Sequence, residues 1–115
     1  MVPLDEPEFT RWRAAAERAR EAAAAQAGSG FHEWACFLSE QAAQLGTKGI
    51  LHGVGAGGWG HDLTALVARA SEVLGTTWPS ELERPAERLA RFYLPTRYPD
   101  ALPGGVPGDR FDAQD

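Results

Sequence analysis

Apolar residues recur at steps of three and four through most of this chain, and that spacing limits what the chain can fold into. Near the start the stripe consists of Phe9, Trp12, Ala16, Ala19 and Ala23. Positions three and four apart share one face of an α-helix, whereas a half-buried strand has apolar residues at every second position. The sequence contains no run of alternating β-branched residues. The pattern therefore predicts an all-α fold.

Helix-ending signals divide this pattern into four main helices. Capping boxes at Asp5 to Glu8 and at Ser80 to Glu83 begin the first and the last of them. The four helices are expected from Asp5 to Gly28, from about Phe31 to Gly53, from His61 or Asp62 to Gly75, and from Pro79 to Pro95. Four helices with short links are typical of an up-and-down bundle.

Several residues predict local departures from regular helix. Gly46 and Gly49 lie in the later turns of the second helix, and each costs up to ~1 kcal/mol relative to alanine. That end therefore either frays or is held by close packing. Pro85 predicts a distorted first turn, or a later start, for the fourth helix. Residues 95–110 contain four prolines and three glycines and are expected to be irregular, and residues 111–115 resemble the first turn of a fifth helix.

Length and composition restrict the class of protein. A chain of 115 residues allows one domain, which we expect to span 1–115 as a single bundle. It has one cysteine, Cys36, and no apolar segment long enough for a bilayer span or a secretory signal. These features predict a cytoplasmic protein. Its net charge of −5 argues against non-specific DNA binding, which depends on neutralising phosphates with basic residues.

Two apparent enzyme motifs fail on inspection. The segment His32-Glu33-Trp34-Ala35-Cys36 resembles a zinc-protease motif but lacks its second histidine, so Cys36 is expected in the core. Gly55, Gly57 and Gly60 match the dinucleotide pattern G-x-G-x-x-G, but they follow a helix where the pattern requires a strand. We therefore expect no metal, no cofactor and no catalytic residue from these motifs.

A basic stripe on the fourth helix is a first candidate for binding. Arg84, Arg88 and Arg91 are spaced by four and three. With Arg97 and one glutamate, the window 84–97 carries a net charge of +3. Taken alone, such a stripe is more typical of a solvated helix face than of a binding site.

The segment Arg97-Tyr98-Pro99-Asp100 is a second candidate. Flanking prolines fix the backbone, which lowers the entropy lost when a guanidinium and an aromatic ring are presented together. That pair suits a nucleotide, with phosphate on Arg97, the base stacked on Tyr98, and Asp100 orienting Arg97. The alternative is a structural corner in which Arg97 pairs with Asp100 and Tyr98 packs on the bundle.

These residues carry a resemblance to a known family. The matching segments are Trp34-Ala35-Cys36-Phe37, Gln41-Ala42-Ala43 with Lys48, Gly60-His61-Asp62-Leu63, and Phe92-Tyr93-Leu94-Pro95-Thr96-Arg97-Tyr98-Pro99-Asp100-Ala101 followed by Pro103 and Gly104. The sequence resembles the HEPN domain, a family of small helical nucleotide-binding proteins, from about Trp12 to Asp115.

The resemblance implies a helical bundle that forms a homodimer and acts beside a minimal nucleotidyltransferase, in a two-component or toxin–antitoxin system. It implies a nucleotide or RNA as ligand, with Lys48 and His61 adding positive charge to the site of Arg97, Tyr98 and Asp100. HEPN proteins usually close with another long helix after the Pro/Gly segment. The present sequence ends at Asp115, where that helix should start, so either the chain is cut short or the bundle lacks a member. A missing helix would expose apolar surface of the first and fourth helices, which a partner chain could cover.

One departure from the family concerns catalysis. Some HEPN proteins are metal-independent RNases with an R-x4-6-H motif, but none of His32, His52 and His61 has an arginine at that distance. Lys48 before His52 is the nearest approach. Three functions stay open: a non-catalytic nucleotide- or partner-binding module, an RNase acting through His61 or His52 with Arg97, and a purely structural dimerisation protein.

Overall fold

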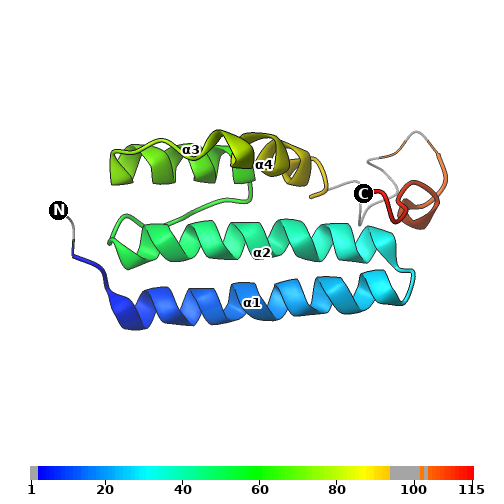
Figure 1. Ribbon diagram of the computed structural model, residues 1–115, viewed down its shortest axis with the longest axis horizontal. Coiled ribbons are helices and arrows are strands. Elements are labelled where there is room, and N and C mark those ends of the chain that lie inside the picture. The colour runs from blue at the N-terminus through cyan, green and yellow to red at the C-terminus, as the bar shows by residue number, and fades with distance from the viewer. Residues whose placement is uncertain (1–2, 94–101, 103) are drawn as a thin grey trace.

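Two long antiparallel helices lie side by side and form the base of the molecule (Figure 1). Helix α1 spans Glu6–Gly28 and helix α2 spans His32–Gly53. The computed structural model describes residues 3–93, 102 and 104–115, apart from the side chain of Glu83. Two shorter helices, α3 (Leu63–Leu74) and α4 (Glu83–Ala90), cover the other side of α2. The described residues contain no strand, so the predicted all-α fold is confirmed.

The start of α1 is fixed by a cap and by the end of α2. The Asp5 side chain accepts a hydrogen bond from the Glu8 N–H at 3.2 Å, as predicted. The Asp5 N–H donates to the Gly53 carbonyl at 2.6 Å and so ties the two helix ends together. Because that N–H is occupied, Glu8 does not complete a reciprocal capping box.

Close packing holds the later turns of α2, which is one of the two outcomes the sequence left open. A Cβ atom at Gly49 would lie 2.7 Å from Cβ of Trp12 on α1. A Cβ atom at Gly46, by contrast, would have no neighbour within 4 Å. Of these two glycines, only Gly49 therefore allows the two helices to approach this closely.

The connection between α2 and α3 runs back along α2. Gly58 lies against Lys48, and His61 lies beside Gln44. Gly55, Gly57 and Gly60 all have positive φ values, which glycine adopts without steric cost. Because the connection returns, α3 starts near the middle of α2 and runs in the same direction (Figure 1).

The buried core lies between α2 and α3. Leu51, Leu66 and Ala70 form its centre, and Ala56, Val73 and Trp78 pack against it. The Trp78 indole N–H donates to the Val67 carbonyl at 2.8 Å and so closes this end of the core. The Asp62 side chain caps α3, where it accepts a hydrogen bond from the Ala65 N–H.

Helix α4 is shorter at both ends than the range from Pro79 to Pro95 that the sequence predicts. A 3-10 turn over Ser80–Leu82 precedes it, which agrees with the late start predicted from Pro85. The helix ends at Ala90, before Pro95, because Arg91 and Phe92 donate to carbonyls three residues back and tighten the last turn. Another 3-10 turn spans Pro107–Asp109, and the Asp115 N–H donates to the Asp112 carbonyl and closes a single turn.

The molecule is elongated, with principal extents of 49 × 25 × 24 Å. Within the described part of the chain, no helix combines the length and apolar character that crossing a membrane requires.

Candidate functional site

Four polar residues on α2 are spaced by four, and the last three of them contact the returning connection. They are Glu40, Gln44, Lys48 and His52. Side chains four apart lie on the same side of a helix, so these four form one row. We call them the α2 row. Residues 54–62 lie along it, since Gly58 contacts Lys48 and His52 while His61 contacts Gln44.

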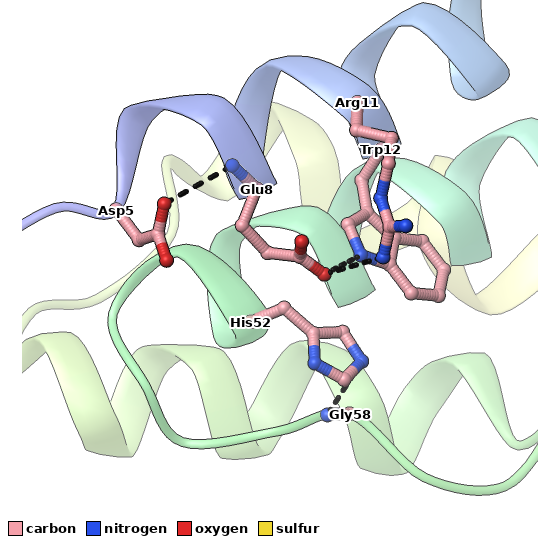
Figure 2. A network of polar contacts seen from close by, with 6 residues as sticks. All are labelled: Asp5, Glu8, Arg11, Trp12, His52 and Gly58. Atoms are coloured by element: carbon pink, nitrogen blue, oxygen red, sulfur yellow. Dashed lines mark hydrogen bonds and ion pairs between the residues drawn. The ribbon is translucent and has the colours of Figure 1, made fainter.

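His52, at one end of the α2 row, has a structural role. Its ring stacks on Trp12 with centroids 4.6 Å apart and meets Trp59 edge to face at 6.0 Å. Its Nε2 accepts a hydrogen bond from the Gly58 N–H at 3.3 Å (Figure 2). Glu8 accepts from Trp12 and Arg11 on the other side of the same cluster (Figure 2). An Nε2 lone pair used in this way is not available as a general base.

His61 has a different environment. It is exposed, and it directly precedes Asp62, the cap of α3. Its ring stacks on Tyr93 with centroids 5.3 Å apart and an interplanar angle of 11°. Its Nδ1 lies 3.4 Å from Oε1 of Gln44, and the Gln44 amide nitrogen also binds the buried Glu40. A solvent-facing imidazole is thus held by contacts from two other elements.

Lys48 lies on α2 between Gln44, which contacts His61, and His52. Its side chain is half-buried beneath Gly58, where an added Cβ would approach Lys48 Cγ to 2.9 Å. Among the described residues no carboxylate forms an ion pair with its ammonium group. Lys48 and His61, both predicted as binding residues, therefore lie in the region where residues 54–62 pack against the α2 row. We call this region the polar seam.

The other three predicted binding residues, Arg97, Tyr98 and Asp100, lie outside the described residues. Tyr93 is the last described residue before them in the sequence.

The basic stripe lies on the exposed side of α4. Arg84, Arg88 and Arg91 line a shallow depression of about 510 Å³ together with Pro85 and Glu87. Arg88 donates a hydrogen bond to the Gln114 carbonyl at 2.8 Å. No ion pair between these arginines and Glu87 is found in the described part of the chain.

A separate apolar groove of about 570 Å³ lies between α2, α3 and α4. None of the residues that line it is charged. Two of its hydroxyl groups are already bonded internally, Thr47 to the Ala43 carbonyl and Ser71 to the Thr76 carbonyl. The groove therefore does not suit a phosphate-bearing ligand.

Cys36 is buried, with 6% of its surface exposed. Burial raises the pKa of its thiol to about 11, and the carboxylate of Asp115 adds to the effect. Within the described residues, no three histidine, cysteine, aspartate or glutamate side chains gather closely enough to hold a metal ion.

Sequence reasoning missed Glu40, Gln44 and Tyr93 as parts of this site. Tyr93 falls within the fourth helix expected from the sequence, where it fits the apolar spacing, and glutamate and glutamine are ordinary helix residues. The available signal was the four-residue spacing of polar residues along a helix that is otherwise packed on two sides.

The fold and this site define a small helical-bundle protein with one polar seam beside its core. A family model described as HEPN domain matches residues 9–115. The chain belongs to the HEPN family, as its sequence motifs predicted.

Two solved structures resemble this chain over 92% of its length. The crystal structure of TT1696 from Thermus thermophilus has a TM-score of 0.85 and 33% identity, with 82% of that chain covered. The crystal structure of ST0689, an archaeal HEPN homologue, has a TM-score of 0.73 and 32% identity, with 80% of that chain covered. Among curated proteins, none matches.

Proposed function

We propose that this chain is a non-catalytic HEPN module that binds a nucleotide or a nucleotide-bearing partner. The observation that carries the proposal is the arrangement of His61, which is solvent-facing, stacked on Tyr93 and bonded to Gln44. A stacked, oriented imidazole in the same seam as a lysine is suited to phosphate recognition, because both groups carry hydrogen-bond donors and can carry positive charge.

The partner in this proposal is a minimal nucleotidyltransferase, and the chain acts as a homodimer. Support comes from family membership, and from an apolar groove and a basic stripe that together offer one neutral and one positive face to a partner. Arg97, Tyr98 and Asp100 complete the ligand site in this proposal, in the roles that their sequence predicts.

Calorimetric titration with ATP, GTP and a short RNA tests the binding function. We expect heat of binding with at least one of them, and a clear loss of affinity in His61→Ala, Lys48→Gln and Arg97→Ala. His32→Ala and Arg18→Ala serve as matched controls, since His32 lies at the other end of α2 and Arg18 lies on α1. Absence of heat with all three ligands would contradict the nucleotide-binding function.

Co-expression tests the partner separately. We expect a minimal nucleotidyltransferase to co-elute with the wild-type chain in size-exclusion chromatography. Elution of the two proteins as separate peaks, at concentrations where the chain itself stays assembled, would rule out that partner while leaving the nucleotide test untouched.

RNase activity remains the second candidate only through His61, because Nε2 of His52 already accepts from Gly58. Cleavage of RNA that persists through purification and disappears in His61→Ala would replace the binding proposal by this one.

A further inference from the structure

A fully buried carboxylate lies behind the ligand site. Glu40 has 0% of its surface exposed, and both of its oxygens accept hydrogen bonds. Oε1 accepts from the Gln44 amide, and Oε2 accepts from the Gln41 amide at 3.0 Å. No arginine, lysine or histidine pairs with it among the described residues. Burial of a carboxylate is costly, so its position in the α2 row calls for a physical reason.

Glu40 fixes the orientation of the Gln44 amide. The amide nitrogen of Gln44 donates to Glu40 Oε1 and also to the His61 carbonyl at 3.1 Å. The His61 carbonyl can only accept, so an inverted amide would set oxygen against oxygen there, and a carboxylate at Glu40 would add a second such contact. The network itself therefore selects the amide orientation.

The same orientation decides which nitrogen of His61 carries a proton. With its nitrogen committed to Glu40, Gln44 turns its Oε1 toward Nδ1 of His61, at 3.4 Å. A carbonyl oxygen can only accept, so Nδ1 must be the protonated nitrogen. Stacking on Tyr93 fixes the plane of the ring, and Nε2 is left on the far side from Gln44.

We propose that Glu40 is the positioning residue of this site: through Gln44, whose Oε1 accepts from Nδ1–H, it orients His61 so that Nε2–H of the imidazolium form contacts the phosphate of the bound nucleotide. This inference rests on the proposed nucleotide-binding function. In the imidazolium form Nε2–H donates to a phosphate oxygen while Nδ1–H still donates to Gln44. Lys48, one turn beyond Gln44 on α2, supplies a second positive charge.

Nitrogen NMR of the labelled protein tests the arrangement without a ligand. The wild type is expected to show neutral His61 as the Nδ1–H tautomer, with the signal assigned through His61→Gln. In Glu40→Gln, residue 40 can donate to Gln44, which removes one of the two contacts that fix the Gln44 amide while the contact to the His61 carbonyl stays, so a fraction of the Nε2–H tautomer should appear beside the Nδ1–H form. A wild-type His61 that is protonated on Nε2 would overturn the proposal, whether or not the variant folds.

Ligand binding tests the purpose of the arrangement. Glu40→Gln is expected to weaken ATP binding about tenfold, the size of effect of losing one well-oriented hydrogen bond to a charged group, and to leave adenosine binding unchanged. Glu72→Gln, the same substitution on α3, is the matched control. Equal ATP affinity in the two variants would overturn the positioning role. A wild type that binds none of ATP, GTP and RNA would overturn the proposed function and the phosphate contact together, while the NMR result would still decide the role of Glu40 in orienting His61.

Discussion

At the scale of single residues, Glu8 links the first turns of α1 to the aromatic cluster beside them. Its Oε1 accepts from the Trp12 indole and from Arg11, each at 2.9 Å, so it braces the aromatic cluster around His52. These hydrogen bonds, first from Trp12 and then from Arg11, lower the pKa of the Glu8 carboxyl.

The lowered pKa of Glu8 predicts part of the acid sensitivity. A carboxyl whose pKa is lower in the folded state stabilises the fold fully above its unfolded value, and this contribution is lost as pH falls through the folded value. We expect Glu8→Gln to be less stable than wild type at neutral pH, with the difference shrinking below about pH 4. Thermal unfolding across this range measures it, with Glu17→Gln as the control because the partner of Glu17 among the described residues is the exposed Arg20. A difference that stays constant with pH would contradict this role.

Cys36 gives a second prediction for a single residue. Its pKa of about 11, against a usual value near 9, means about 100-fold less thiolate at neutral pH than in the unfolded chain. We expect alkylation to be slower by at least that factor in native protein than in urea. The thiol of Cys36 keeps its proton to a higher pH in the folded state than in the unfolded state. Its ionisation therefore favours the unfolded state, and the free energy of unfolding should fall as pH rises above 9. Equal alkylation rates in both states would show that the thiol is not buried.

At the scale of helices, the packing of α1 on α2 depends on Gly49. We expect Gly49→Ala to destabilise the protein by about 1–3 kcal/mol, because a Cβ 2.7 Å from Trp12 Cβ forces the helices apart. Gly46→Ala lies in the same helix, with no neighbour within 4 Å, and should stabilise by roughly 0.5–1 kcal/mol. Urea unfolding of both variants gives the comparison. Stabilisation by both substitutions would mean that helix propensity, and not close packing, governs this end of α2.

The helices themselves could be predicted from sequence because their signals are local. Asp5 and Asp62 cap the helices that they precede, and Pro85 delays α4 as its ring requires. The path of residues 54–62 could not be predicted. It depends on His61 meeting Gln44, seventeen residues earlier, and glycine-rich sequence permits many paths.

The site could be predicted only in part, because it too depends on contacts between residues distant in sequence. Lys48 and His61 were found through their resemblance to family motifs, and the structure brings both to one seam. Glu40 and Gln44 have no local signal, because their role arises only when the connection returns along α2.

At the scale of the whole molecule, exposed surface argues for assembly. The chain exposes 7372 Å², whereas a monomer of 12.4 kDa is expected to expose roughly 6,100 Å². The excess of about 1,300 Å² exceeds the roughly 800 Å² that each partner buries in a standard interface. Large apolar side chains contribute to it, with Trp59 at 81%, Phe31 at 55% and Trp34 at 45% exposure.

This excess predicts a homodimer in solution. Light scattering coupled to size-exclusion chromatography should give a mass of about 25 kDa, twice the 12.4 kDa of one chain. The large exposed side chains named above are apolar, and apolar contacts are not screened by ions. The dimer should therefore persist at about 1 M salt, where the screening length is roughly 3 Å and an interface built on the α4 arginines would dissociate. A mass of 12.4 kDa at micromolar concentration would contradict the dimer, whereas dissociation in salt alone would move the interface to Arg84, Arg88 and Arg91.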